Sequence, residues 1–280
     1  MRFTKSHGAG NDFIVIDARS LTRDWNALAK QMCDRHFGVG SDGIILVEDS
    51  PVAELRMRMF NPDGSEAEAC GNGLRCFVKY AADNRLVQTQ TFQVDTLGGI
   101  RKVTAFPGDG SPVTEAEVSM GVPHLQGSDI PALVSGLAAP ILTTNLEVLD
   151  ITLALSLVSM GNPHAVAFMD EGITDFALGR YGPTVEHHHM FPARINFEIA
   201  QLLGPHDVKA RVWERGAGET LACGTGACAI AVAARLNGYC SDNIHVHLPG
   251  GTLSVTWGDL DEEVLLRGPV KEVFTGNWPE

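Results

Sequence analysis

The chain has 280 residues, of which 44% are hydrophobic and 20% are charged, and 21 Lys and Arg against 34 Asp and Glu give a formal net charge of −13. The hydrophobic share excludes global disorder, and the length is typical of about two domains. The acidic balance argues against nucleic acid and against an anionic membrane as partners. Because there is neither an apolar run of about 18 residues nor the apolar core of a signal peptide, we expect a cytoplasmic protein without a membrane span.

Short apolar strands are predicted in both halves of the chain. In chain order they cover residues 13–16, 43–47, 55–60, 165–169, 208–213, 244–248 and 253–257. A helix is predicted over residues 26–36, where Leu28, Met32 and Phe37 recur near one face. A linker rich in Pro, Gly and Ser is predicted over residues 121–140. Strands mixed with helices in this way predict an α+β half on each side of the linker.

An internal repeat divides the chain. Residues 59–73 align without a gap with residues 212–226, at an offset of 153 residues, and both segments contain Cys-Gly-x-Gly. A Gly-Asn dipeptide precedes each segment, and a Gly-Gly dipeptide follows each. Three matches in the same order predict a tandem duplication, which we place as two domains over residues 1–122 and 123–268.

Each repeat carries a cysteine, Cys70 or Cys223, directly before Gly-x-Gly at the start of a predicted helix. Glycines leave backbone N–H groups uncovered, and these groups together with the helix dipole suit a carboxylate. If the duplicated halves face each other, the two thiols flank one carbon acid. One thiolate then removes a proton and the opposite thiol returns one, which inverts a stereocentre. The pattern therefore predicts a racemase or epimerase.

A thiol needs help to act as a base at neutral pH. Its ordinary pKa is about 8.5, and lowering this to about 7 requires ~2 kcal/mol. A helix N-terminus supplies typically ~0.3–1 kcal/mol. We therefore expect a proton acceptor near each thiol. The candidates are His164, which follows Gly161-Asn162-Pro163, and Glu214 in the second repeat.

The other four cysteines lack the Gly-x-Gly context. Cys33, Cys76, Cys228 and Cys240 are expected to pack in the core. Disulfides are not expected in a cytosolic chain of this length. Because no Cys-x-x-Cys pair occurs, no metal site is predicted.

Several segments spread over the chain resemble the diaminopimelate epimerase family. They are residues 5–13, 61–65, 69–76, 161–164, 192–198, 214–220, 222–226 and 267–270. The resemblance implies an α+β fold of two pseudo-symmetric duplicated domains, each a β-sheet wrapped on a central helix, with residues 269–280 packing back on the first. It implies an enzyme that uses no cofactor and interconverts LL- and meso-2,6-diaminopimelate, in lysine and peptidoglycan precursor synthesis. The implied partners are this small-molecule substrate and a second copy of the chain in a homodimer.

The resemblance also implies roles for individual residues. Cys70 and Cys223 would be the acid/base pair. Backbone N–H groups or side chains that hold the substrate would come from Asn11, Asn61, Gly71, Asn72, Asn162, Asn196, Glu214, Arg215, Gly224 and Thr225. Arg215 suits a carboxylate, whereas Glu214 and amide oxygens suit ammonium groups. The asparagines at 61, 162 and 196 have a simpler alternative role as turn caps.

The chain departs from the family pattern in three places. Gly43 stands where some members carry a Gln that contacts substrate, and Ile195 stands where Thr is more usual. The run His187-His188-His189 replaces the usual single histidine. None of these departures touches the proposed acid/base groups.

Two other functions stay open from the residues alone. A proline racemase or hydroxyproline epimerase would use the same two-thiol chemistry, but such enzymes tend to carry His after the first Cys-Gly, where this chain has Asn72. A non-catalytic amino-acid-binding or thiol redox protein would bind a ligand, or join Cys70 to Cys223 in a disulfide, without exchanging substrate hydrogen. Hydrogen exchange on a substrate therefore separates the enzymes from the non-catalytic protein.

Overall fold

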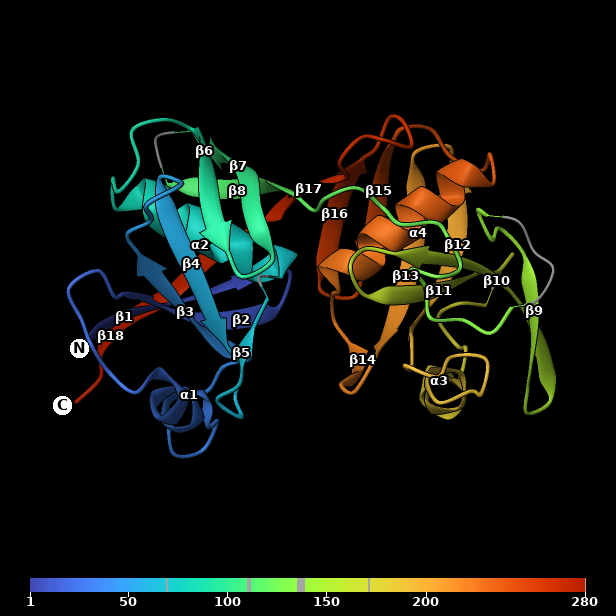
Figure 1. Ribbon diagram of the computed structural model, residues 1–280, viewed down its shortest axis with the longest axis horizontal. Helices are drawn as coiled ribbons and strands as arrows, with labels where there is room; N and C mark the ends of the chain where they lie inside the picture. Colours follow the sequence, from blue (N-terminus) through green and yellow to red (C-terminus); the bar gives the residue numbers. More distant parts are fainter. Residues whose placement is uncertain (69, 110–111, 135–138, 171, 280) are drawn as a thin grey trace. The chain divides into compact units, whose positions relative to one another are not determined.

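The computed structural model describes residues 1–68, 70–109, 112–134, 139–170 and 172–279. The chain divides into two compact units. Unit 1 comprises Met1–Ser119 and Arg267–Glu280, and unit 2 comprises Met120–Leu266 (Figure 1). Over its described residues each unit combines a β-sheet with two helices, so the predicted α+β class is confirmed.

Unit 1 is a mixed sheet that wraps around one helix. Its elements are β1 (Arg2–Gly8), β2 (Asn11–Asp17), α1 (Trp25–Cys33), β3 (Gly43–Glu48), β4 (Leu55–Phe60), β5 (Glu66–Ala67), α2 (Gly71–Asp83), β6 (Thr91–Thr96), β7 (Gly99–Pro107), β8 (Val113–Ser119) and β18 (Lys271–Asn277). Neighbouring strands follow the order β18–β1–β2–β3–β4–β6–β7–β8, and β2/β3 and β4/β6 are the parallel pairs. At the far edge β8 pairs with β17 (Leu265–Pro269), which leads directly into β18. The sheet therefore curves back on itself around α2.

The central helix α2 packs against seven strands, β1, β2, β3, β4, β7, β8 and β18. Such a position requires apolar side chains around most of the helix. Leu74, Phe77, Val78 and Ala81 meet this need and are buried. The charge of the buried Lys79 is balanced by Asp83, whose Oδ2 accepts from Lys79 Nζ at 2.7 Å, and the same Nζ donates to the carbonyl oxygen of Val113 at 2.7 Å. Burial on all sides fixes the position of the helix N-terminus, where Cys70 lies.

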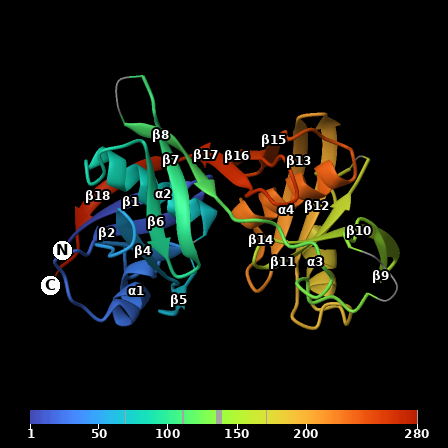
Figure 2. The same ribbon diagram turned by 45° about the horizontal axis from the view of Figure 1, so that its top comes forward.

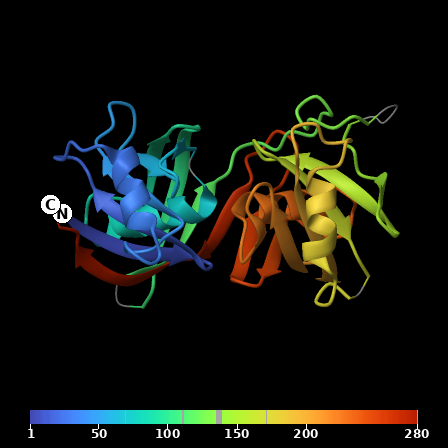
Figure 3. The same ribbon diagram turned by 90° about the horizontal axis from the view of Figure 1, so that it is seen from below.

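Helix α1 covers the outer face of the sheet, over β3 and β4 (Figure 3). Trp25 and Met32 pack there against a cluster that includes Ile44 and Phe60. The helix ends at Cys33, three residues before the predicted end. Asp34 accepts backbone N–H bonds from residues 36 and 37 and so closes a separate turn. Phe37 is consequently 92% exposed, and the prediction that it lies on the packed face of the helix is wrong.

Unit 2 repeats this arrangement. Its elements are β9 (Thr144–Val148), β10 (Ile151–Ser159), β11 (Pro163–Phe168), α3 (Leu178–Glu186), β12 (Asn196–Gly204), β13 (Asp207–Glu214), β14 (Gly218–Thr220), α4 (Gly224–Leu236), β15 (Asn243–Leu248) and β16 (Gly251–Thr256). Its strands follow the order β9–β10–β11–β12–β13–β15–β16, with β11/β12 and β13/β15 parallel. Helix α4 packs against β10, β11, β12, β15 and β16, and α3 packs on β9, β12, β13 and β14.

The two units correspond element by element (Figure 2). Both α2 and α4 contain 13 residues, and their first residues, Gly71 and Gly224, are 153 residues apart. The first residues of β3 and β12, Gly43 and Asn196, have the same separation. Parallel pairs also occur at matching places, β2/β3 with β11/β12 and β4/β6 with β13/β15. The predicted class, two duplicated halves that each carry a central helix, is confirmed.

The two chain ends lie side by side in unit 1 (Figure 3). The N-terminal amine donates to the carbonyl oxygen of Trp278 at 2.7 Å, and β18 pairs with β1 from Asn277 to Lys271. The last strand therefore completes the sheet that the first strand begins. Within the described part of the chain, none of the helices has the length and apolar character needed to span a bilayer.

Candidate active site

Each central helix begins directly after one of the two repeated cysteines. Cys70 is the N-cap of α2, with extended backbone angles of φ −96° and ψ 152°, and its Sγ accepts the Gly73 N–H at 3.2 Å. Cys223 is the N-cap of α4 in the same way, with φ −114° and ψ 119°, and its Sγ accepts the Gly226 N–H at 3.4 Å. Such capping bonds stabilise negative charge on the acceptor, which here is sulfur.

The glycine three residues after each cysteine leaves space for the thiol. A Cβ at position 73 would lie 3.2 Å from Cys70 Sγ, and a Cβ at position 226 would lie 3.2 Å from Cys223 Cβ. The same Cβ at 226 would also lie 3.0 Å from Oε1 of Glu198. The second glycine of each Gly-x-Gly motif therefore lies where an added Cβ would crowd the cysteine.

In unit 1 a chain of polar side chains surrounds the start of α2. Asn72 Nδ2 donates to Asn11 Oδ1 at 3.2 Å, and Asn11 Nδ2 donates to Asp42 Oδ2 at 2.6 Å. On the other side of Asn72 the fully buried Arg75 donates to its Oδ1 at 2.8 Å. The structure thus joins two of the predicted residues, Asn11 and Asn72, on adjacent elements of one unit.

Asn61 makes the turn contacts that the sequence predicted as an alternative. It follows β4 and opens a tight turn, in which the Gly64 N–H donates to the Asn61 carbonyl oxygen at 2.9 Å. Its side-chain Nδ2 donates to Ser65 Oγ at 3.0 Å. Gly64 has a φ of 84°, which glycine adopts without strain. In this structure Asn61 therefore stabilises a turn.

In unit 2 a line of hydrogen bonds leads from Cys223 into the core. Cys223 Sγ lies 3.4 Å from Thr225 Oγ1, which accepts from Asn162 Nδ2 at 3.3 Å. Asn162 Oδ1 lies 3.0 Å from His164 Nε2, and His164 Nδ1 lies 2.7 Å from Glu198 Oε1. Both ring nitrogens of His164 are therefore bonded within unit 2 to groups other than a thiol.

Three further predicted residues, Asn196, Glu214 and Arg215, lie at or next to the adjoining turn between β13 and β14. Asn196 Nδ2 donates to the Pro163 carbonyl oxygen at 2.8 Å, and its Oδ1 accepts the Arg215 N–H at 2.9 Å. Glu214 Oε1 accepts from Thr220 Oγ1 at 2.5 Å. Strands β11 and β12 are parallel neighbours, and His164 lies opposite Asn196. Their pairing therefore brings these polar groups together where the two strands begin.

The surroundings of Cys223 favour the neutral thiol. Burial raises its pKa well above the ordinary value, and the nearby Glu214 carboxylate raises it further. The hydrogen bonds from Thr225 and from the Gly226 N–H act in the opposite direction. Burial also raises the pKa of Glu198, and His164 opposes this rise. The balance of these effects keeps the Cys223 sulfur in its neutral thiol form.

Comparison with known proteins identifies the family. A family model described as diaminopimelate epimerase matches residues 3–125 and 156–273. The diaminopimelate epimerase of Moorella thermoacetica is 46% identical over 281 residues, an alignment that covers 100% of this chain and 99% of that protein. The diaminopimelate epimerase of Methanococcus maripaludis is 44% identical over 277 residues and 99% of both chains.

The chain belongs to the diaminopimelate epimerase family. Solved structures with low sequence identity share its fold. A phenazine biosynthesis protein from Bacillus anthracis superposes with a TM-score of 0.71 at 19% identity over 99% of this chain and 98% of its own. A hydroxyproline epimerase from Agrobacterium vitis, with bound trans-4-hydroxy-L-proline, gives a TM-score of 0.68 at 12% identity, over 99% and 91%. At such identities the likeness extends to the fold alone.

Sequence reasoning missed three buried residues of this family member. Glu198 contacts His164, Arg75 contacts Asn72, and Glu186 holds the turn after Arg215 by accepting the Gly216 N–H at 2.9 Å. One signal for Glu198 was available, because residues two apart on a strand share a face and Asn196 was already a candidate. No comparable pattern marks the others, since a charged residue in a helix is usually solvated.

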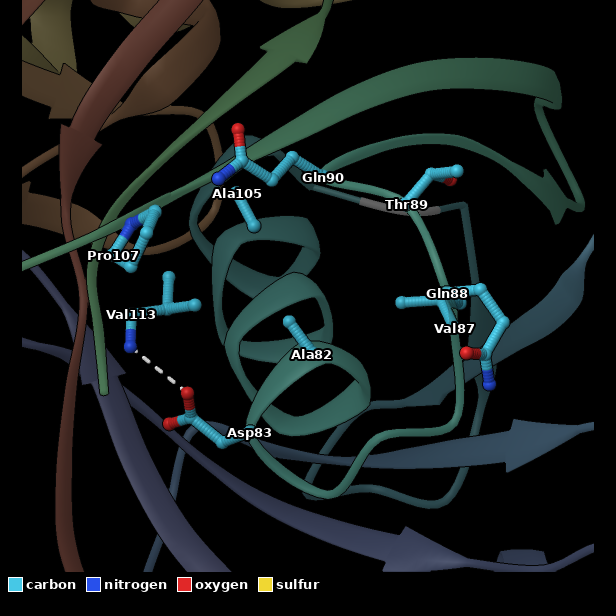
Figure 4. Close-up of a pocket in the computed structure, with 9 residues that line it drawn as sticks. All are labelled: Ala82, Asp83, Val87, Gln88, Thr89, Gln90, Ala105, Pro107 and Val113. Atoms are coloured by element: carbon cyan, nitrogen blue, oxygen red, sulfur yellow. Dashed lines mark hydrogen bonds between the residues drawn. The ribbon is translucent and has the colours of Figure 1, made fainter. Parts of the chain in front are cut away.

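Other features of the molecule lie apart from the thiols. A pocket of about 200 Å³ in unit 1 is lined by residues that include Ala82, Asp83 and Val113 (Figure 4). It adjoins the C-terminal end of α2, about 20 Å along the helix from Cys70. Among the described residues no group of three His, Cys, Asp or Glu is arranged to hold a metal ion. The lining of the pocket contains neither Cys70 nor Cys223.

The remaining cysteines and the departures from the family pattern have structural settings. Cys33, Cys76 and Cys228 are buried, as predicted, and burial raises the pKa of Cys76 to about 12. Cys240 is only half-buried and lies 3.6 Å from the Gly204 carbonyl oxygen, so its predicted core position is wrong. Gly43 begins β3, where a Cβ would lie 2.8 Å from the Phe60 carbonyl oxygen. The histidine run follows the end of α3.

Proposed function

We propose that this chain interconverts LL- and meso-2,6-diaminopimelate with Cys70 and Cys223 as its acid/base pair. Family membership establishes an isomerase that acts on diaminopimelate, an intermediate of lysine and peptidoglycan precursor synthesis. The observation that supports the residue assignment is that each thiol is the N-cap of the central helix of its unit, at equivalent positions of a duplicated fold. Two equivalent thiols are what a two-base reaction requires.

In the proposed reaction one α-proton is removed and one is returned. The thiolate of one cysteine takes the proton from the α-carbon, and the thiol of the other delivers its proton to the opposite face. No oxidant, reductant or cofactor enters, because the substrate and product differ only in configuration. The pair of thiols exchanges protonation states in each turnover, and the reverse reaction begins from the exchanged state.

The helix N-termini are proposed to hold the carboxylate of the reacting centre. The first amides of an α-helix have no intrahelical carbonyl partner. In both helices the third amide, at Gly73 or Gly226, donates to the cysteine sulfur. The two preceding amides, at Gly71 and Asn72 in one helix and at Gly224 and Thr225 in the other, are the donors assigned to the carboxylate. Hydrogen bonds to the carboxylate stabilise the charge that develops when the α-proton leaves.

His164 and Glu214 are proposed to set the protonation of the thiols. Glu214 acts through its charge, which raises the pKa of Cys223. His164 acts within unit 2 through Asn162 and Thr225, the two residues that connect its Nε2 to the sulfur. This indirect route differs from a direct bond between an imidazole and a thiol.

The polar residues around the thiols are proposed to bind the distal amino-acid head of the substrate. Diaminopimelate carries an ammonium and a carboxylate at each end, so a second cluster of donors and acceptors is needed. Amide oxygens and Glu214 suit the ammonium, and the Arg215 guanidinium suits the carboxylate. The remaining members of this proposed set are Asn11, Asn61, Asn162 and Asn196. Proline has no second head and would make no contact with these groups.

Proton NMR in D2O tests the assignment. Reduced enzyme is incubated separately with LL-diaminopimelate, meso-diaminopimelate and trans-4-hydroxyproline. We expect loss of the α-hydrogen signal and appearance of the other isomer for diaminopimelate only. Cys70→Ala and Cys223→Ala should each lower epimerisation by about a hundredfold or more, and Cys240→Ala is the matched control. Exchange on hydroxyproline alone would move the chain to that substrate class, and no exchange on any substrate would favour a binding or redox protein.

We further propose that the chain acts in the cytoplasm as a homodimer and without nucleic acid. The formal charge of −13 opposes binding to phosphate backbones. Strand β18 is exposed along almost its entire length and presents Val273 and Phe274 to solvent, a surface typical of strands that pair or pack with another chain. Val273→Lys should lower the sedimentation mass from dimer to monomer, whereas Val52→Lys at another exposed site should not. An unchanged mass would place the interface elsewhere.

A further inference from the structure

Glu198 is a buried acid that lies outside the proposed acid/base pair and the proposed substrate-binding groups. It lies on β12 with 0% of its surface exposed, and its Oε1 lies 2.7 Å from Nδ1 of His164. Its second oxygen, Oε2, has no hydrogen-bond partner among the described residues. The titratable groups that face it are His164, Glu214 and Cys223. None of these is a fixed cation, so a charge on Glu198 would lack an independent counter-ion.

The hydrogen bonds between Glu198 and Cys223 have a definite direction. Asn162 donates through Nδ2 to Thr225, so its Oδ1 faces His164 and needs a donor there. His164 Nε2 must therefore carry a hydrogen. Thr225 accepts from Asn162, which leaves its own hydroxyl hydrogen for Cys223 Sγ at 3.4 Å. The three bonds that connect His164 to Cys223 through Asn162 and Thr225 then all point toward the sulfur.

The remaining choice concerns the proton between Glu198 and His164. Either a neutral carboxyl donates to Nδ1 of a neutral imidazole, or an imidazolium donates to a carboxylate. A buried carboxylate would leave a charged Oε2 without a donor, which is costly, whereas a neutral carboxyl leaves only a carbonyl oxygen. A carboxylate would also add negative charge beside Cys223 and Glu214. Burial raises the pKa of Glu198, in agreement with the neutral form.

We propose that Glu198 is a protonated positioning residue, whose carboxyl hydrogen bonds to His164 Nδ1 and so fixes His164, Asn162 and Thr225 in the arrangement that aims a hydroxyl donor at Cys223. This inference rests on the proposed role of Cys223 as one of the acid/base thiols. The carboxyl proton stays between Glu198 and His164 through the reaction. The thiolate of Cys223 is stabilised by the Thr225 hydroxyl and the Gly226 N–H when the thiol has given up its proton.

Two substitutions separate this role from a charged pair. Glu198→Gln keeps a donor for Nδ1, because the amide NH2 can occupy the place of the carboxyl O–H. Glu198→Met has a similar volume and no donor. We expect Glu198→Gln to keep activity within about threefold of the unchanged enzyme, and Glu198→Met to lower kcat by about tenfold to a hundredfold with little change in KM. Glu147→Gln, at an exposed position on β9, is the matched control.

A direct readout of the imidazole makes the test independent of turnover. In protein labelled with 15N-histidine, His164 should show a protonated Nε2 and an unprotonated Nδ1 under the conditions of the activity assay. Glu198→Gln should preserve this signature and the pH dependence of Cys223 alkylation, read by mass spectrometry of its peptide. Glu198→Met should lose the signature and shift alkylation to higher pH.

Defined outcomes would overturn the proposal. Two protonated nitrogens on His164 in the unchanged protein, or an equal loss of activity in Glu198→Gln and Glu198→Met, would show that Glu198 is a charged partner. The NMR result on the unchanged protein decides the protonation even if Glu198→Met does not fold. If Cys223→Ala retained turnover, the proposed function would fail, and the imidazole signature would still report on Glu198.

Discussion

At the scale of single residues, the setting of each cysteine decides its chemistry. Cys76 and Cys223 are both buried, and burial raises the pKa of each. Unlike Cys76, Cys223 also accepts hydrogen bonds at a helix N-terminus, from Thr225 and Gly226, and it lies near the carboxylate of Glu214. A thiol in that setting is protonated at neutral pH and yet has donors ready for its thiolate, as a reversible acid requires.

Removing the charge of Glu214 should make Cys223 more acidic. A carboxylate beside a thiol opposes thiolate formation, so Glu214→Gln lowers the pKa of Cys223, and the alkylation of Cys223 by iodoacetamide shifts to lower pH. Mass spectrometry of the peptide that contains Cys223 measures the shift. Glu219→Gln, at an exposed position on β14, should leave the profile unchanged. An unchanged or upward-shifted profile in Glu214→Gln would contradict the electrostatic role.

A methyl group at position 226 should disturb the same thiol. In Gly226→Ala the new Cβ would lie 3.0 Å from Glu198 Oε1 and 3.2 Å from Cys223 Cβ, so both residues must shift by a few tenths of an ångström. We expect kcat/KM to fall by about tenfold to a hundredfold, because small displacements of reacting groups are costly. Gly179→Ala in α3, where nothing lies within 4 Å of an added Cβ, is the control. Equal activity of the two variants would argue that Cys223 tolerates displacement.

At the scale of elements, helices place functional groups through their ends. The N-termini of α2 and α4 carry the thiols, and the C-terminal residue of α3 supports the turn between β13 and β14. That residue, Glu186, accepts from the Trp213 indole at 2.8 Å and from the Gly216 N–H at 2.9 Å. Because Gly216 directly follows Arg215, α3 determines where the proposed substrate-binding turn lies.

Replacing the Glu186 carboxylate by an amide should loosen this turn. In Glu186→Gln one oxygen still accepts a hydrogen bond, but the NH2 group faces a second donor and cannot accept from it. The loss of one buried hydrogen bond should lower the free energy of unfolding by about 1–3 kcal/mol. Urea denaturation should show this loss, and KM for diaminopimelate should rise more than kcat falls. Glu263→Gln, at an exposed position, should change neither quantity. A stable variant with unchanged KM would separate α3 from substrate binding.

Helix α1 offers a contrasting case, because its cap has a structural task only. Asp24 accepts the Ala27 N–H at 3.0 Å at the start of α1. Asp24→Ala should lower the free energy of unfolding by about 1 kcal/mol and leave kcat unchanged. Asp261→Ala, at an exposed turn, should have no measurable effect on stability. A loss of activity larger than the loss of stability would indicate that α1 communicates with the site.

At the scale of the whole molecule, the ends of the chain complete one unit together. Strand β18 covers β1, Phe274 packs edge-on against Phe3, and Arg267 pairs with Glu115 on β8. Phe3 and Phe274 come from opposite ends of the sequence, and Arg267 and Glu115 are 152 residues apart. Unit 1 therefore forms fully only after the whole of unit 2 has been synthesised.

A chain that ends at Pro269 should lose the structure of unit 1 selectively. Without β18, strand β1 has an open edge and Phe3 is exposed, so amide hydrogens in β1 and β2 should exchange rapidly with deuterium. Amides in β15 and β16, which belong to unit 2, should stay protected. A shorter deletion that removes only residues 279 and 280 is the control. Retained protection of β1 in the chain that ends at Pro269 would show that β18 is dispensable.

Local and repeated features were readable from the sequence. The alignment of residues 59–73 with residues 212–226 located the duplication. Gly-x-Gly after Cys70 and Cys223 located the two helix starts, and apolar runs located the main strands. The predicted end of the helix at residue 36 is wrong. Phe37 continues the apolar spacing, but the Asp34 side chain accepts the backbone N–H groups of residues 36 and 37 and ends the helix, which apolar spacing alone does not reveal. The half-buried Cys240 was misjudged because its burial depends on distant chain segments.

The sequence by itself determined the family, the duplicated halves, the two thiols and the type of chemistry, because these depend on local motifs and their spacing. Only the tertiary structure decided which buried groups support the thiols. The connection of Cys223 through Thr225, Asn162 and His164 to Glu198 arises from parallel pairing of β11 with β12 and from packing of α4 against both strands. The separations involved, 34 residues between His164 and Glu198 and 63 between Asn162 and Thr225, lie beyond any local pattern, so folding alone brings these groups within hydrogen-bond distance.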